Sequence, residues 1–153
     1  MKKVSIQDLK PGLIKGVEVY LPSEQTDAYK ETYFCWAASP LIAEMKCSNI
    51  SGGILKTWHH TPIFTEVETH IEPEMFYFIS GTALMLFMDL KDGAADMDTA
   101  QIVRIQADTQ LIISTGKAHF VPVAESDEPV IIIVVSPKVD APRTSLSTPV
   151  EAV

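Results

Sequence analysis

The sequence predicts an all-β domain, built as a two-sheet sandwich or a closed barrel. From Gly52 onward the chain consists of short apolar segments separated by turns that contain glycine, proline or acidic residues. The most apolar runs, L-M-L-F-M and V-I-I-I-V-V, have the length of buried strands and fall far short of the ~20 residues that a membrane helix needs. Many short strands with frequent turns are typical of sandwiches and barrels. The two-sheet jelly roll is the version whose interior holds a small ligand.

The expected strands follow one another at short intervals through the middle of the chain. Pro62 and Gly81 interrupt the early strands, and an acidic turn around Gly93 separates them from the later ones. Phenylalanine and methionine alternate along residues 75–80 and 82–90, which indicates core packing rather than a cofactor surface. In order, the expected strands are residues 54–60, 63–70, 75–80, 82–90, 100–105, 110–114, 118–123 and 129–135.

The two ends of the chain are less regular than the middle. Residues 1–50 suggest a turn at Lys10 to Gly12, a strand over 16–21 and a helix that begins at a Ser23 cap and covers residues 23–30. The prolines and hydroxyl residues after Ser136 predict an extended or disordered tail. We therefore expect an N-terminal extension packed on the barrel over residues 1–50, the barrel over 51–136 and a tail over 137–153.

Composition narrows the classes of function. A chain of 153 residues with 46% apolar content is long enough for one domain with a sizeable core. Its net charge of −8 repels nucleic acids and anionic membranes, so neither is expected as a partner. Two cysteines are too few for a disulfide framework, and the N-terminus shows no apolar signal region, which together favour a cytoplasmic protein.

A group of histidines and glutamates carries the chemistry of the sequence. Residues at positions i and i+2 of a strand share a face, so Glu68 and His70 point the same way. Glu74 follows a turn and opens the next strand, aimed back at the same space, and His119 comes from a later hairpin. Two imidazoles and one carboxylate suit Fe(II), Mn(II), Ni(II) or Zn(II). The sequence therefore predicts a divalent metal held by His70, Glu74 and His119, with Glu68 as a fourth ligand.

The same residues resemble the motifs of the cupin superfamily. The first cupin motif, G-x5-H-x-H-x3,4-E-x6-G, is matched by His70, Glu74 and Gly81, while Glu68 stands in the place of the first histidine. The second motif is matched by Gly116 and His119. This resemblance implies a cupin fold, that is, a double-stranded β-helix or jelly-roll barrel, with a less regular N-terminal segment.

Residues 62–135 also resemble the ureidoglycolate lyase family of small cupins, through E-T-H-I-E-P-E-M-F and K-A-H-F-V-P. This resemblance implies a small polar carboxylate or ureido compound as substrate. Glu74 would act as base and His70 or His119 as acid, with Glu68 as a further acid or base, because two close carboxylates split their pKa values. A cation would hold the substrate carboxylate, and the candidates are Lys117, Arg104 and Lys56.

Other interpretations stay open at the level of sequence. The cavity could bind a sugar or carboxylate as a sensor without catalysis, or the triad could support an Fe(II) oxygenase. The same polar residues could also form an inert hydrogen-bonded core. His59 and His60 are expected to pack at a strand end more often than to line the pocket. A homodimer is expected in each case, because an apolar sheet edge or face tends to pair with a second copy.

Overall fold

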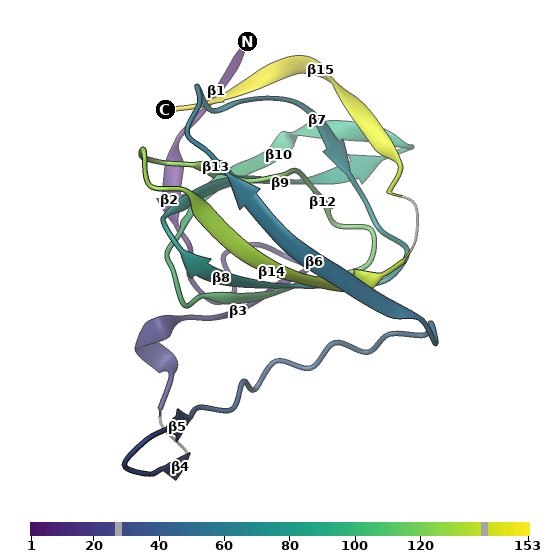
Figure 1. The fold of residues 1–153 in the computed structure, drawn as a ribbon. Helices are drawn as coiled ribbons and strands as arrows, with labels where there is room; N and C mark the ends of the chain where they lie inside the picture. The colour runs from purple at the N-terminus through teal and green to yellow at the C-terminus, as the bar shows by residue number, and fades with distance from the viewer. Residues whose placement is uncertain (27–28, 139–140) are drawn as a thin grey trace.

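The structure is a computed structural model that describes residues 1–26, 29–138 and 141–153, and its strands form two sheets that face each other (Figure 1). The large sheet contains β1 (Lys2–Val4), β2 (Ile6–Asp8), β7 (Ile63–Glu68), β9 (Ala83–Lys91), β10 (Ala94–Ile105), β12 (Ala118–His119), β13 (Val123–Ala124) and β15 (Arg143–Ala152). The small sheet contains β3 (Val17–Tyr20), β6 (Ile50–Thr57), β8 (Glu74–Ser80), β11 (Gln110–Ile113) and β14 (Val130–Pro137). A short hairpin of β4 (Tyr29–Lys30) and β5 (Cys35–Trp36) lies outside both sheets.

The order of the strands makes this fold a jelly roll. From β6 onward the chain passes from the small sheet to the large sheet and back, with β7, the β9–β10 hairpin and β12 in the large sheet and β8, β11 and β14 in the small one. The strands from β6 onward pair with one another in antiparallel fashion, as in β8 with β11 and β14. The all-β jelly-roll barrel expected from the sequence is therefore confirmed.

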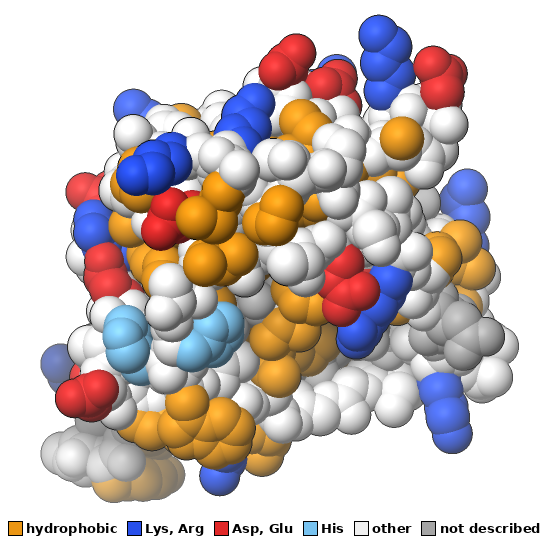
Figure 2. Space-filling model, turned by 90° about the horizontal axis from the view of Figure 1, so that it is seen from above, with side chains coloured by type: hydrophobic (Ala, Val, Ile, Leu, Met, Phe, Trp, Pro, Cys, Tyr) orange, Lys and Arg blue, Asp and Glu red, His pale blue; other side chains and the backbone are white. Residues whose placement is uncertain are grey.

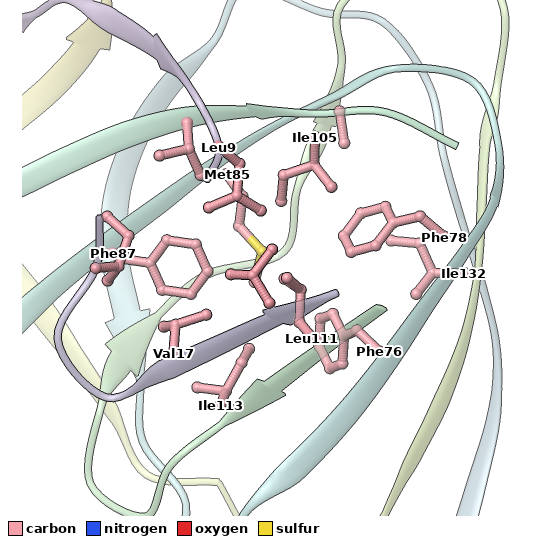
Figure 3. Packing of buried hydrophobic residues seen from close by; sticks show 14 of the residues in the cluster. Leu9, Val17, Phe76, Phe78, Met85, Phe87, Ile105, Leu111, Ile113 and Ile132 are labelled. Atoms are coloured by element: carbon pink, nitrogen blue, oxygen red, sulfur yellow. The ribbon is translucent and has the colours of Figure 1, made fainter. Parts of the chain in front are cut away.

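Two apolar cores lie on opposite faces of β9. Met85 and Phe87 point into the barrel, where they pack with Phe76 and Phe78 of β8 between the two sheets (Figure 3). The alternate residues of β9, such as Leu86, point to the outer face of the large sheet. There they belong to a second cluster of buried apolar residues. This strand is therefore buried on both faces, which explains why its sequence is a continuous apolar run. The predicted core role of these phenylalanines and methionines is confirmed.

The β9–β10 hairpin is longer than the sequence suggested. Asp92 and Gly93 form its tip, and both have positive φ angles, 53° and 80°. An Asp-Gly pair with this geometry is the preferred two-residue connection between antiparallel strands. Strand β10 therefore begins at Ala94, inside the segment that the sequence analysis treated as an acidic turn.

The N-terminal region contributes strands to both sheets. β1 and β2 pair in parallel with β15 and β10, and β3 pairs with β11, which agrees with the strand expected over residues 16–21. The expected helix over residues 23–30 is wrong where it is described: a single 3-10 turn, η1 (Pro22–Glu24), is followed by extended backbone at Gln25 and by β4. Pro22 fits the first turn of this element, but no periodic apolar face continues beyond it. Residues 27–28 of the expected helix lie outside the described residues.

From Arg143 to Ala152 the C-terminal segment is a paired strand rather than the extended or disordered tail expected over residues 137–153. Residues 139–140 of that expected tail lie outside the described residues. β15 pairs with β7 on one side and with β1 on the other. Val150 is fully buried in the core on the outer face of the large sheet, and Leu146 packs against the same core. The prolines were misleading because Pro149 lies between Ser145 and Val150, where the register with β7 shifts and the ladder hydrogen bonds are interrupted. The proposed division of the chain at residues 50 and 136 stays a prediction.

No helix in the described part of the chain has the length and apolar character needed to cross a membrane.

Gly81 offers a direct test of the packing between β8 and β14. Its φ angle is +73°, and an added Cβ would lie 2.7 Å from the carbonyl oxygen of Pro129. Gly93 has a similar φ of +80° but open space around it, so it is a matched control. We expect Gly93→Ala to cost about 1 to 2 kcal/mol of unfolding free energy through backbone strain alone. Gly81→Ala should cost clearly more, as measured by urea denaturation, and equal losses would contradict the close approach.

Candidate functional site

The structure brings the predicted ligands together across both sheets. Glu68 ends β7 and is in register with His119 of β12 in the large sheet. Glu74 opens β8 in the small sheet. His70 lies in the turn between β7 and β8, and its carbonyl oxygen accepts a 2.9 Å hydrogen bond from the backbone N–H of Gly116. The turn before His119 therefore fixes the turn that carries His70.

The distances place one carboxylate oxygen between two imidazole rings. Glu74 Oε2 lies 3.0 Å from His70 Nε2 and 3.1 Å from His119 Nε2. Glu68 Oε1 lies 3.9 Å from His70 Nε2. The two rings stack with their centroids 5.3 Å apart. The ligand atoms that Glu68, His70 and His119 offer all lie within 4.8 Å of one another, so the group can hold a metal ion.

The hydrogen bonds of His119 define which of its nitrogens is free. Its Nδ1 lies 2.9 Å from the carbonyl oxygen of Lys117, which can only accept a hydrogen bond, so Nδ1 carries the proton. In the neutral ring, Nε2 then presents a lone pair to Glu74. A backbone carbonyl behind the ring is the usual support of a histidine that binds metal through its other nitrogen.

His70 presents a similar unpaired nitrogen. Its Nε2 is buried and has no hydrogen-bond partner with suitable geometry among the described residues, although Glu74 is only 3.0 Å away. Two imidazole nitrogens and a carboxylate oxygen thus point at one another, and His119 Nε2 is within hydrogen-bond distance of Glu74 Oε2. A divalent cation satisfies all of these lone pairs at once, so the residues present fit such an ion.

The group is buried, and burial affects the pKa of His70. His119 is 1% exposed and Glu74 is 6% exposed. Burial lowers the pKa of His70, and the nearby His119 lowers it further, while the carboxylates of Glu74 and Glu68 oppose the shift. His70 is therefore neutral at pH 7 and available as a ligand.

The interior core supports the rings from behind. Phe76 meets the His119 ring edge-on, with 6.1 Å between centroids, and Phe87 lies 6.3 Å from the same ring. Both phenylalanines belong to the core between the sheets. The group therefore lies at the end of the packed interior, where the side chains are held by close packing rather than by solvent.

A cavity of about 280 Å³ reaches this group from the surface. Glu68 and Glu74 form its polar part, and its remaining walls come from β6, β14 and the segment after His119. The lining residues are Gly53, Ile54, Leu55, Glu68, Glu74, Phe76, Val121 and Val134. A space of this size holds a small molecule of a few heavy atoms, and both carboxylates face it.

The three cations suggested by the sequence lie in three different environments. The ammonium group of Lys117 is 2.8 Å from Asp89 and the side chain is nearly buried. Arg104 donates to Glu125 and Asp8, and these hydrogen bonds, chiefly those to Glu125, raise the pKa of the guanidinium group. Lys56 lines a separate cavity with His59 and His60. Their role in binding a substrate stays a prediction.

Arg143 is a site cation that the sequence analysis missed. Its Nε lies 3.8 Å from Glu68 Oε2, its Nη1 donates to Glu66 at 2.9 Å, and its guanidinium lies over the Phe120 ring at 5.5 Å. The residue begins β15 and reaches the site because that strand pairs with β7. No local signal marks it, because a pairing between residues 68 and 143 is visible only in the folded chain.

Comparisons with known proteins define similarity at the level of the fold. No family model matches the sequence, and no curated protein matches it. Among solved structures, the oxalate decarboxylase of Bacillus subtilis is 17% identical, with a TM-score of 0.48 over 90% of this chain and 30% of that chain. RmlC of Streptococcus suis, in complex with dTDP-D-xylose, is 13% identical, with a TM-score of 0.47 over 60% of this chain and 45% of that one.

A further structure of the Bacillus subtilis oxalate decarboxylase, concerned with the Mn(II) centres of that enzyme, is 18% identical, with a TM-score of 0.48 over 92% of this chain. This chain spans about a third of the length of the oxalate decarboxylase chain. Likeness at this level concerns the arrangement of strands and does not extend to metal, substrate or reaction.

Proposed function

We propose that this protein binds one divalent metal ion through His70, Glu74 and His119, with Glu68 as a fourth ligand or as the acid and base of a reaction. The observation that carries the proposal is the Glu74 carboxylate oxygen placed 3.0 and 3.1 Å from two imidazole nitrogens. His119 donates its Nδ1 proton to a backbone carbonyl, so in the neutral ring its Nε2 is free to bind a metal ion.

The ligand types narrow the ion to Mn(II), Fe(II), Ni(II) or Zn(II). Two carboxylates in or beside the donor set favour the harder ions Mn(II) and Fe(II) over copper. A bound ion would supply a Lewis acid and remove the repulsion between Glu68 and Glu74.

Metal content tests this proposal directly. We expect purified protein loaded with Mn, Fe, Ni or Zn to hold close to one ion per chain by elemental analysis. His70→Ala together with His119→Ala should abolish the retained metal. Metal at a free concentration of 100 times its Kd should raise the unfolding free energy of the wild type by about 2.7 kcal/mol and leave the double variant unchanged.

The chain supplies its own control in its other two histidines. His59 and His60 bond backbone carbonyls and lie outside the metal group, so His59→Ala with His60→Ala should retain the ion. Equal loss in both double variants, or no metal in the wild type after reloading, would contradict the site.

For the reaction, we infer a carbon–nitrogen lyase that acts on a small ureido carboxylate such as ureidoglycolate. Glu68 is the more accessible carboxylate, with a side chain 17% exposed against 7% for Glu74, and it faces the cavity. It would take the proton of the carbinol hydroxyl while the C–N bond breaks to leave glyoxylate. The same carboxyl group would then protonate the departing urea nitrogen, so that protons balance. Arg143, beside Glu68, would hold the substrate carboxylate.

Urea release from ureidoglycolate tests this reaction. We expect Arg143→Met to lower kcat/KM by about tenfold or more, mainly through KM, because a charged hydrogen bond contributes about 1.5 to 3 kcal/mol. Arg104→Met is the matched control, since Arg104 is committed to Glu125 and Asp8 and should leave KM unchanged.

The outcomes of this assay separate the remaining interpretations. Bound metal without urea release, but with oxygen uptake, would favour the oxygenase. Absence of metal with urea release would favour acid–base catalysis by Glu74 with a histidine. Absence of both, with saturable binding of a sugar or carboxylate, would favour a sensor.

We also propose that the chain forms a homodimer, which buries apolar side chains that the single chain exposes. Tyr33 is 85% exposed and Trp36 is 63% exposed in the segment around the β4–β5 hairpin, which extends away from the barrel (Figure 1). On the outer face of the small sheet, Ile54 and Ile133 are neighbours in register and are also exposed. Packing the aromatic segment of one copy on this face of another would bury both.

Sedimentation velocity at micromolar concentration tests the dimer. We expect a dimer for the wild type and a monomer for Ile54→Lys with Ile133→Lys, because two charges would have to be desolvated in the interface. Val153→Lys, at an equally exposed apolar residue at the chain end, should remain dimeric. A monomeric wild type would overturn the proposal.

A further inference from the structure

A second cavity lies beside the first, on the other side of Val121. Its volume is about 310 Å³, and it is formed by residues 56–60, 63–64 and 120–123. Val121 lines both cavities, and β6 passes from one to the other. The metal proposal does not use this space, and its volume is within the range of small-molecule sites.

The walls of this cavity are mostly apolar and include an exposed tryptophan. Trp58 is 64% exposed, whereas Phe64 is only 2% exposed and gives the cavity a dry wall. Phe120 and Ile63 complete this apolar part. Figure 2 shows two histidine side chains beside a group of hydrophobic side chains on one face of the molecule. A large indole left in water beside apolar walls gains free energy when a ligand covers it.

The polar groups of the lining are positive or neutral. Lys56 lines the cavity and has no ion-pair partner within the described ranges, and no aspartate or glutamate lines it. His59 and His60 are both held by hydrogen bonds from Nδ1 to backbone carbonyls, at 3.0 and 2.8 Å. In a chain with a net charge of −8, a lining that contains a lysine and, among the described residues, no carboxylate favours an anion over a cation.

Thr57 adds an independent sign of a missing partner. Its side chain lines the cavity, the residue is 7% exposed, and its hydroxyl has no hydrogen-bond partner among the described residues. A buried hydroxyl without a partner costs free energy, so a ligand group that reached it would gain a hydrogen bond.

We propose that this cavity is a second binding site, for a small carboxylate that carries an aromatic or branched apolar group. The apolar group would lie against Trp58 and Phe120. The carboxylate would take a charge-assisted contact from Lys56 and a hydrogen bond from Thr57. The proposal is independent of the metal centre, because none of its residues is a metal ligand.

Trp58 provides the signal for the test. The chain has two tryptophans, so Trp36→Phe leaves Trp58 as the only one. We expect 3-phenylpropionate to change the Trp58 fluorescence in a saturable way in this background. The neutral analogue 3-phenylpropionamide should bind at least fivefold more weakly. Absence of a saturable change, or equal affinities for acid and amide, would overturn the site.

Variants at the polar residues locate the probe. Lys56→Met should weaken binding at least fivefold, and the nearly isosteric Thr57→Val at least threefold, each with a circular dichroism spectrum like that of the parent. Lys91→Met, at an exposed lysine of β9, should leave the affinity unchanged. His70→Ala with His119→Ala should also retain binding, and its loss there would place the probe in the metal centre and overturn the proposal.

Discussion

The buried carboxylate of Glu74 is the constraint on which the rest of the site depends. A carboxylate that is 6% exposed must be neutralised or hydrogen-bonded, because an unpaired charge in the interior is very costly. The chain places two imidazoles against it but gives one of them, His119, a backbone carbonyl that uses its Nδ1 proton. A divalent ion would supply positive charge at this carboxylate, and this requirement links the burial, the ring orientation and the proposed chemistry.

The jelly roll is what makes this arrangement geometrically stable. Glu74 belongs to the small sheet and His119 to the large one, so their distance is fixed by the packing between the sheets. Phe76 and Phe87 fill that space and contact the His119 ring. Because interiors are packed at the density of organic crystals, small shifts of either sheet would be resisted by the core before they reached the ligands. Strand β15 then adds Arg143 from outside, through its pairing with β7.

The sequence revealed those parts of the fold and the site that depend on local patterns. The alternation in β7 and the spacing to Glu74 and His119 sufficed to predict that the four ligand candidates converge. The short strands and turns sufficed for a sandwich or barrel, and the resemblance to the cupin motifs narrowed this to a jelly roll. Features that depend on distant pairing were not visible. The strand at 143–152 is an example: half of it faces solvent, and Pro149 argued against a strand, whereas burial of Val150 and pairing with β7 decide the outcome.

The side chains predicted to bind a substrate carboxylate show the same limit of inference from local sequence. Lys117 is one of three candidates and lies two residues from His119 in sequence, yet its ammonium group pairs with Asp89, which proximity along the chain cannot reveal. Arg143 lies far from Glu68 in the sequence. Among the contacts described, it is nevertheless the cationic side chain nearest to the Glu68 carboxylate.

The two cavities on either side of Val121 differ in charge although they share β6 as a wall. Among the described residues, one is lined by Glu68 and Glu74 and by no cationic side chain, and the other is lined by Lys56 and by no carboxylate. A free anion entering the first meets two negative charges, so it can bind there only when a metal or Arg143 compensates them. The same anion meets no such barrier in the second. Val121 thus separates a negatively charged cavity from a positively charged one. The first cavity favours a cation, and the second favours an anion.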